Sequence, residues 1–375
     1  MDFDKLLKKL PEYDLWQYLK LQDKPIVMYG MGNGADKIIQ VCTEHDINIS
    51  DFFASDGFVR GHSFHGKVVL SYSQICEKYG NGNFIILLSF ASSLPDVINN
   101  IKYIASQNEL YAPDVPVTGS DLFDLAFFRS RIDLFRRAYN LLADDESRNI
   151  FCNVVLYKLT GDISYLFNAE SNVDDVFTDV LRTSKYRTFA DLGAYNGDTI
   201  RQLLNYTDTV RRVLALEPDK RSYKRLEKYA ADEDRCEILL SRAAAWDKSE
   251  ILSFDSGGNR NSNVYSGVSF QAPVTNKVEI FGATLDELVA EHSFDSLDYI
   301  KYDVEGAEEP AILGSVNTIN KFAPDVLISL YHRSEDLYSL PLLFSRIAKP
   351  EYKYYLRRFR YIPAWDLNLY CISND

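Results

Sequence analysis

Two glycine-rich turns constrain the fold of this 375-residue chain more than any other feature of its sequence. The first, at residues 30–35, follows a short apolar run at 26–29, and the second, at 191–199, follows the run at 188–192. Helical spacing begins directly after each turn. Because a strand, a glycine turn and a helix in this order build a parallel sheet, the sequence predicts an α/β protein with two Rossmann-like units.

The predicted elements divide the chain into three domains or segments. Residues 1–115 alternate short strands with helices and predict a smaller Rossmann-like βαβ domain. Residues 116–184 lack strand alternation and predict a helical connector. Residues 185–375 hold a second series of strands and helices, which ends in two strands joined through Pro363. That ending predicts an antiparallel hairpin at the edge of a parallel sheet.

Composition excludes several classes of protein. Lys and Arg number 41 and Asp and Glu 54, so the formal charge is −13, which disfavours binding to nucleic acids or anionic membranes. The five cysteines are scattered without zinc or redox spacing, which suits reduced thiols in a cytoplasmic protein. No apolar run approaches the roughly 20 residues that span a bilayer. His62 and His65 alone do not predict a metal site, and we expect none.

Acidic residues follow three successive predicted strands of the second series. Asp191 can accept a hydrogen bond from an ammonium group, Glu217 can bind both ribose hydroxyls, and Asp247 can accept from an adenine amine. Gly193 allows a sharp turn, and Gly197 allows the backbone to approach a ligand closely. Together these positions describe an S-adenosylmethionine site. The alternative interpretation is a glycine turn with acids that cap helices.

A second group of polar residues follows two further strands. Asp303 ends the strand predicted at 297–302, and Glu305 lies just beyond it. A carboxylate at this sheet edge can orient a substrate hydroxyl or help to remove its proton, although a solvated acidic loop is the simpler interpretation. His332 follows the strand predicted at 324–330, and a neutral imidazole there can act as a general base near pH 7. We hypothesise that His332 accepts the proton while Asp303 orients the imidazole or the substrate.

The stretches 191–199, 300–308 (IKYDVEGAE) and 327–333 (LISLYHR) resemble the FkbM family of S-adenosylmethionine-dependent methyltransferases. The resemblance covers residues 185–375 and implies a class I methyltransferase domain that methylates hydroxyls of sugars, glycolipids or polyketide-type products. It implies cofactor contacts at Asp191, Gly193, Gly197, Glu217 and Asp247, and a reaction face at Asp303, Glu305 and His332. Tyr195 replaces the middle glycine of the wider DxGxGxG pattern, which implies a bulky side chain near the methionine moiety of the cofactor.

The first glycine turn leaves the role of the N-terminal domain open. Residues 29–35 match the pattern GxGxxA, and Asp56 could contact a ribose. The surrounding stretch resembles the Rossmann-like module of sugar acyltransferases and nucleotide-sugar enzymes, which implies a nucleotide or nucleotide-sugar partner. We favour a module without a nucleotide, because no hydride- or acyl-transfer residues accompany the turn.

We therefore expect an O-methyltransferase that acts on a hydroxyl of a sugar, a glycolipid or a related small molecule. One alternative is a nucleotide-sugar or NAD-linked oxidoreductase or epimerase that uses the first turn. Another is a non-catalytic binding protein built on two similar scaffolds, because such folds host many functions.

Overall fold

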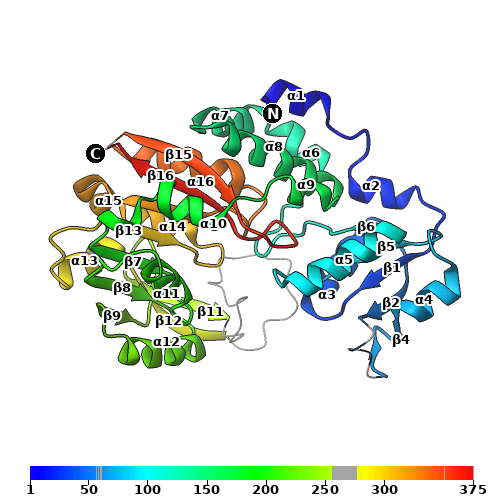
Figure 1. Ribbon diagram of the computed structural model, residues 1–375, viewed down its shortest axis with the longest axis horizontal. Helices are drawn as coiled ribbons and strands as arrows, with labels where there is room; N and C mark the ends of the chain where they lie inside the picture. Colours follow the sequence, from blue (N-terminus) through cyan, green and yellow to red (C-terminus); the bar gives the residue numbers. More distant parts are fainter. Residues whose placement is uncertain (56, 58, 60, 256–276, 350, 375) are drawn as a thin grey trace.

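The computed structural model describes residues 1–55, 57, 59, 61–255, 277–349 and 351–374. Two mainly parallel sheets lie toward opposite ends of an elongated molecule, and a group of helices lies between them (Figure 1). This arrangement confirms the predicted α/β class. Among the described helices, none combines the length and the apolar character that crossing a bilayer requires. Asp56, the acid predicted to contact a ribose, lies outside the described residues.

The first sheet has the strand order β3-β4-β2-β1-β5-β6, in which only β3 pairs antiparallel with its neighbour. Its strands are β1 (Ile26–Tyr29), β2 (Ile49–Ala54), β3 (Ser63–Phe64), β4 (Lys67–Ser71), β5 (Ile85–Leu88) and β6 (Glu109–Tyr111). Its helices are α2 (Leu15–Lys20), α3 (Asn33–Glu44), α4 (Tyr72–Tyr79) and α5 (Pro95–Gln107). Because side chains alternate along a strand, Ile26 and Met28 enter one core and Val27 and Tyr29 the other.

The second sheet has the strand order β15-β16-β14-β13-β7-β8-β9. Its strands are β7 (Thr188–Leu192), β8 (Arg212–Leu216), β9 (Glu237–Ser241), β13 (Tyr299–Tyr302), β14 (Asp325–Ser329), β15 (Tyr352–Arg358) and β16 (Leu367–Ser373). Its helices are α11 (Asp198–Leu204), α12 (Lys220–Asp232), α13 (Leu285–Glu291), α14 (Glu308–Leu313), α15 (Val316–Phe322) and α16 (Asp336–Ile347). The predicted antiparallel hairpin is confirmed as β15 and β16. Strand order reverses between β7 and β13, where the carboxyl ends of parallel strands form a ligand crevice.

The segment between the sheets packs against both of them. It contains α6 (Leu125–Ser130), α7 (Ile132–Leu141), α8 (Asp145–Thr160), α9 (Ser164–Phe167), α10 (Val173–Asp175), a π-helical turn (Val176–Val180) and a 3₁₀ turn (Thr183–Lys185). Helix α8 is buried on nearly every side: Val154 and Val155 join the core of the second sheet, and Tyr157 joins that of the first. Helix α1 (Phe3–Lys8) packs with the second sheet's core through Phe3 and Leu6, although the sequence groups it with residues 1–115.

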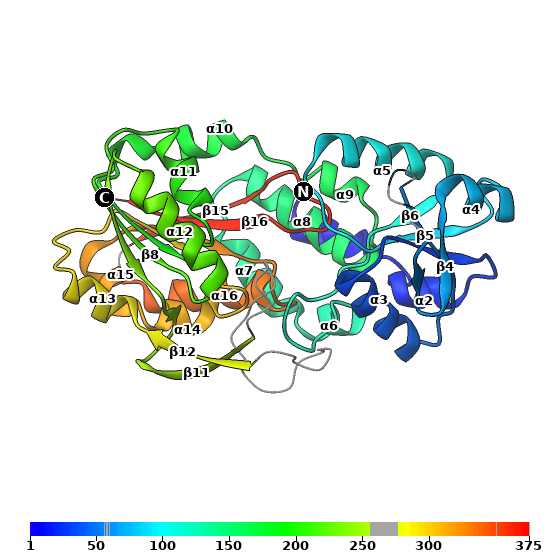
Figure 2. The same ribbon diagram turned by 90° about the horizontal axis from the view of Figure 1, so that it is seen from below.

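A small third sheet was not anticipated from the sequence. It joins β10 (Ala244–Ala245), β12 (Lys277–Ala283) and β11 (Glu250–Asp255), in that order. The strand β11 pairs antiparallel with β12 over six residue pairs, and both lie below α12 and the second sheet in Figure 2. Strand β10 has only two residues, too few to produce a visible alternation.

Candidate active site

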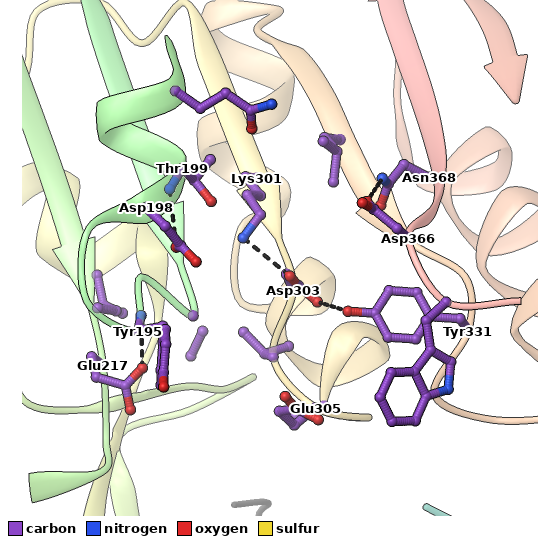
Figure 3. A pocket seen from close by; sticks show the side chains of 18 of the residues that line it. Tyr195, Asp198, Thr199, Glu217, Lys301, Asp303, Glu305, Tyr331, Asp366 and Asn368 are labelled. Atoms are coloured by element: carbon purple, nitrogen blue, oxygen red, sulfur yellow. Dashed lines mark hydrogen bonds and ion pairs between the residues drawn. The ribbon is translucent and has the colours of Figure 1, made fainter. Parts of the chain in front are cut away.

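A cavity of 430 Å³ opens at the carboxyl ends of β7, β8, β13 and β14. Side chains from the glycine loop, from the ends of β8 and β13, and from the β15–β16 connection surround it (Figure 3). A volume of this size is within the range of pockets that hold a small-molecule cofactor. Of the residues predicted to contact the cofactor, Gly193, Tyr195 and Glu217 line the cavity.

The two glycines of the second turn are required for close packing. Gly193 has φ +88°, and a Cβ atom at this position would overlap the backbone oxygen of Asp303. Gly197 has φ +81°, and its Cβ would overlap the ring of Tyr229. Gly197 therefore makes room for the Tyr229 side chain of α12, and the close approach to a ligand that the sequence predicted there stays a prediction. Gly193 allows β7 to end directly beside Asp303.

Glu217 is held at the cavity wall by the backbone on both sides. The Tyr195 N–H donates to Oε2 of Glu217 at 2.9 Å, and the Asp219 N–H donates to Oε1 at 2.7 Å. Burial raises the pKa of this carboxyl to about 8, against the opposing effect of the two N–H donors. The group lies where a ribose would meet the end of the second strand in this fold. Tyr195 itself has φ +47° and faces the same cavity.

A buried chain of charges links Asp191 to Asp303 through Lys301. The Lys301 Nζ lies 3.7 Å from Oδ1 of Asp191 and 3.1 Å from Oδ2 of Asp303. Asp191 is fully buried, and its two oxygens make no hydrogen bond to the described residues. Burial raises the pKa of Asp191 to about 6, opposed by Lys301. Asp191 therefore acts on the cavity through Lys301, which lines it directly.

Sequence reasoning missed Lys301. Burial lowers the pKa of its ammonium group, but Asp303 and Asp191 outweigh that effect and raise it, so the group stays protonated. Lys301 pairs with Asp191 in the register of β13 and β7, which places both side chains on one side of the sheet. A lysine inside an otherwise apolar strand, two residues before Asp303, was the signal available in the sequence.

Asp303 and Glu305 project into the cavity with opposite ionisation behaviour. Burial raises the pKa of Asp303, but Lys301 and His332 outweigh it and hold the pKa well below its usual value. The Tyr331 hydroxyl donates to Oδ1 of Asp303 at 2.9 Å. For Glu305, burial dominates and raises the pKa to about 8, although His332 opposes it. Asp303 is thus a permanent anion, whereas Glu305 exchanges its proton near neutral pH.

His332 is buried beneath these carboxylates. Its Nδ1 lies 3.0 Å from Oε1 of Glu308, and its Nε2 lies 3.5 Å from Oε2 of Glu305 and 3.7 Å from Oδ1 of Asp303. Burial lowers the pKa of the imidazole, but Glu308 and the other carboxylates outweigh it and raise the pKa to about 10. An imidazole with this pKa is protonated at pH 7, which argues against the predicted role as general base. His332 is also not among the described residues that line the cavity.

Asp303, Glu308 and His332 could also hold a metal ion, because one ligand atom of each lies within 4.8 Å of the others. However, both carboxylates already have partners. Oε1 of Glu308 accepts the N–H of Val304 at 2.9 Å and that of Gly306 at 3.4 Å, and Asp303 contacts Lys301 and Tyr331. An ion-pair network therefore accounts for the positions of all three side chains, and Glu308 also fixes the shape of the loop after β13.

Asp247 lies apart from the other predicted cofactor residues. Its side chain is exposed and is not among the described residues around the cavity, whereas Ala243, Ala244 and Ala245 are. Strand β10 lies at the edge of the cavity, and Asp247 follows the end of that strand, outside the cavity. The structure thus brings together Asp303, Glu305, Gly193, Tyr195 and Glu217 around one cavity. It places Asp191 and His332 behind the wall, and Gly197 and Asp247 elsewhere.

Comparison with a family model matches residues 191–354 to "Methyltransferase FkbM domain". Among solved structures, the chain is similar to methyltransferase FkbM from Methylobacillus flagellatus KT, with a TM-score of 0.65 and 20% identity. The match covers 93% of this chain and 90% of that one, so it supports the fold along nearly the whole length. A search of curated proteins finds no relative of this chain.

Weaker structural similarities extend to other methyltransferases. An O-methyltransferase from Bacillus cereus in complex with SAH has a TM-score of 0.35 and 10% identity, over 66% of this chain and 97% of that one. Fibrillarin from Aeropyrum pernix, with natively bound S-adenosyl-L-methionine, has a TM-score of 0.31 and 13% identity, over 51% and 68%. These two similarities are too low to inform the site.

Proposed function

We propose that this chain, an S-adenosylmethionine-dependent methyltransferase by its FkbM domain at residues 191–354, methylates a hydroxyl of a sugar, a glycolipid or a related small molecule. The observation that carries the proposal is the pair of carboxylates of Asp303 and Glu305 on the cavity wall, next to the cofactor residues. A hydroxyl oxygen must lose its proton when it is methylated, and a carboxylate can accept that proton.

The residues around the cavity fit the cofactor. Glu217 offers carboxylate oxygens for ribose hydroxyls, and the cavity beside it is lined by the small side chains of Ala243, Ala244 and Ala245, which leave room for a flat ring. Lys301 is the only cationic side chain among the described lining residues, so it is the natural contact for the cofactor's carboxylate. When bound, S-adenosylmethionine supplies a methyl group that is already electrophilic because it is attached to a sulfonium.

Alignment of the acceptor is the first task of the protein's own residues. Asp303 remains ionised and is fixed by Lys301 and Tyr331, so its position is set before any substrate arrives. A fixed carboxylate can accept a hydrogen bond from an acceptor hydroxyl and orient its oxygen. In well-oriented model reactions, such alignment contributes up to about 7–11 kcal/mol.

Proton removal is the second task, and we place it at Glu305. Its carboxylate lines the cavity, and His332 lies 3.5 Å behind it as a buried cation that stabilises the charged form. This assignment reverses the order expected from the sequence, in which the imidazole accepted the proton. An acid with a pKa of about 8 is protonated below that pH, so activity is expected to rise as the pH rises through 8.

The test is transfer of a labelled methyl group to a panel of sugars, glycolipids and small hydroxylated molecules. Glu305→Gln should lower turnover by about 10²- to 10⁴-fold on any acceptor found, the usual contribution of a positioned base. Glu309→Gln is the matched control, because Glu309 is exposed on the next helix and should leave turnover unchanged. If Glu305→Gln kept full turnover and the same pH profile, the proposed base would be wrong.

A further inference from the structure

One wall of the cavity is aromatic and comes from the connection between β15 and β16. Tyr361 and Trp365 both line the cavity, and their ring centroids are 5.6 Å apart. The Trp365 ring also stacks at 6.4 Å on Tyr331, which donates its hydroxyl hydrogen to Asp303. Figure 3 shows Tyr331 and Asp366 across the cavity from Glu217. The aromatic wall therefore faces the acceptor side of the cavity, and Glu217 marks the cofactor side.

The charge of the cavity limits what this wall can bind. Among the described residues, five carboxyl side chains and one lysine line the cavity. They are Asp198, Glu217, Asp303, Glu305 and Asp366, with Lys301. The Asn368 amide donates to Oδ1 of Asp366 at 2.9 Å, which holds this carboxyl beside the aromatic residues. A phosphate placed here would meet the negative charge of Asp303 throughout the neutral range, and that of Glu217 and Glu305 as well above their pKa of about 8. An uncharged ring, or one that carries an amine, meets no such repulsion.

The aromatic wall is held in place by the first sheet. The Ser92 N–H donates to the Ile362 carbonyl at 2.9 Å, and the Ile362 N–H donates to the Ser92 carbonyl at 3.0 Å. Ser92 belongs to the segment that leads from β5 into α5. Ile362 is 1% exposed and belongs to the apolar core of the first sheet, together with Tyr29 and Leu88. The residue after Tyr361 is thus anchored in the N-terminal part of the molecule.

We propose that Tyr361 and Trp365 form an acceptor subsite for a ring without negative charge, and that the first sheet serves to hold this subsite in position through Ser92 and Ile362. The inference rests on the proposed function, because it needs an acceptor that approaches the cofactor from this side. It gives the N-terminal sheet a task that requires no nucleotide. A rigid wall lowers the ordering cost of acceptor binding, which is the physical benefit of the anchor.

The first test compares one ring at three charges. Glucosamine, glucose and glucose 6-phosphate are titrated into the full chain saturated with S-adenosylhomocysteine, with saturation-transfer NMR as the readout. Glucosamine and glucose should bind, and glucose 6-phosphate should bind at least about tenfold more weakly than either. Trp365→Phe should lower the affinity for glucosamine and for glucose. Trp246→Phe changes a residue outside this cavity and should leave both affinities unchanged. Equal or preferred binding of the phosphate, or no binding of any ring, would overturn the subsite.

The second test addresses the anchor. Ile362→Ala should raise the KM for an acceptor severalfold while the affinity for S-adenosylmethionine, measured by calorimetry, stays within twofold of wild type. Ile362→Val removes one methylene and should raise the KM by a smaller factor. This variant keeps the test available if Ile362→Ala does not fold. A KM unchanged in the valine variant and in any folded alanine variant would overturn the anchor. Failure of the proposed function looks different: no acceptor would receive a methyl group from wild type.

Discussion

The two sheets of this molecule carry similar glycine turns that do different work. In the second sheet, Gly193 lets β7 end against Asp303, and a cavity opens beside the turn. In the first sheet, two of the three glycines of the turn pack closely against the chain itself. A Cβ on Gly34 would overlap the Ser89 carbonyl oxygen, and one on Gly30 would lie 2.7 Å from both Phe90 and Ser89.

The comparison shows that a glycine motif indicates close packing of the backbone, and that a ligand site needs further evidence. At the first turn, the segment after β5 occupies the close approach, and the same segment continues to the Ser92 anchor. At the second turn, acids at the ends of β8 and β13 surround open space. Glycines of both turns pack against the chain itself, so the motif alone does not encode the cavity that opens beside the second turn. This agrees with the interpretation of the first unit as a module without a nucleotide, which stays a prediction.

The largest expected difference between the sheets concerns their lysines. Lys301→Met would leave the fully buried Asp191 without its cationic partner, and breaking such a buried pair costs about 3–5 kcal/mol of unfolding free energy. Lys78→Met, which removes the half-exposed partner of Asp51 in the first sheet, should cost less than about 1 kcal/mol. Urea unfolding of both variants measures the comparison. Equal costs would remove the distinction between the two charge networks.

A second difference appears in the pH dependence of stability. Glu217 has a folded-state pKa raised to about 8, so its contribution to stability is full below its unfolded value and is lost as the pH rises through 8. Asp51 behaves oppositely: burial raises its pKa, Lys78 and Tyr79 outweigh that effect, and its contribution is lost as the pH falls. Hydrogen exchange should therefore show the second sheet loosening first at pH 9. Glu217→Gln should reduce that loss, and an unchanged pH profile would contradict the assignment.

A third, smaller effect separates two glycines of the first turn. Gly34→Ala forces a Cβ against the backbone at Ser89 and should destabilise the protein by about 1–3 kcal/mol, as overpacking does. Gly32 has open space around its Cβ position, so Gly32→Ala carries only a backbone cost of about 1–3 kcal/mol, because φ +98° and ψ −161° are almost confined to glycine. Thermal unfolding measures both variants. A Gly34→Ala protein as stable as wild type would show that the first turn is not closed by Ser89.

The smallest effect is expected at Asp247. Because this side chain is exposed and lies outside the cavity, Asp247→Asn should change the affinity for S-adenosylmethionine by less than about twofold, the size of an ordinary surface substitution. Calorimetry on the two proteins is sufficient. A tenfold or larger loss of affinity for S-adenosylmethionine would support the cofactor contact that the sequence predicted for Asp247.

The sequence predicted the parts of this structure that depend on local pattern. Strand β7 has the bounds that its apolar run indicates, and Asp303 and Glu305 reach the cavity because parallel strands end at one edge. Local pattern could not show the burial of His332 among three carboxylates, because those partners come from another strand end and its loop. It also could not show that Ser92 meets Ile362, since the two residues are far apart along the chain.

The account depends on one site for S-adenosylmethionine, at the second sheet. Its most direct test is calorimetric titration of the methyl donor into wild type, Glu217→Gln and Asn33→Ala, the last an exposed change at the first turn. At pH 9, where Glu217 is ionised, we expect one donor per wild-type chain and an affinity about 10- to 100-fold weaker in Glu217→Gln, since hydrogen bonds to a charged group are worth about 1.5–3 kcal/mol. We expect no change in Asn33→Ala. Binding that Glu217→Gln leaves intact and Asn33→Ala removes would contradict it.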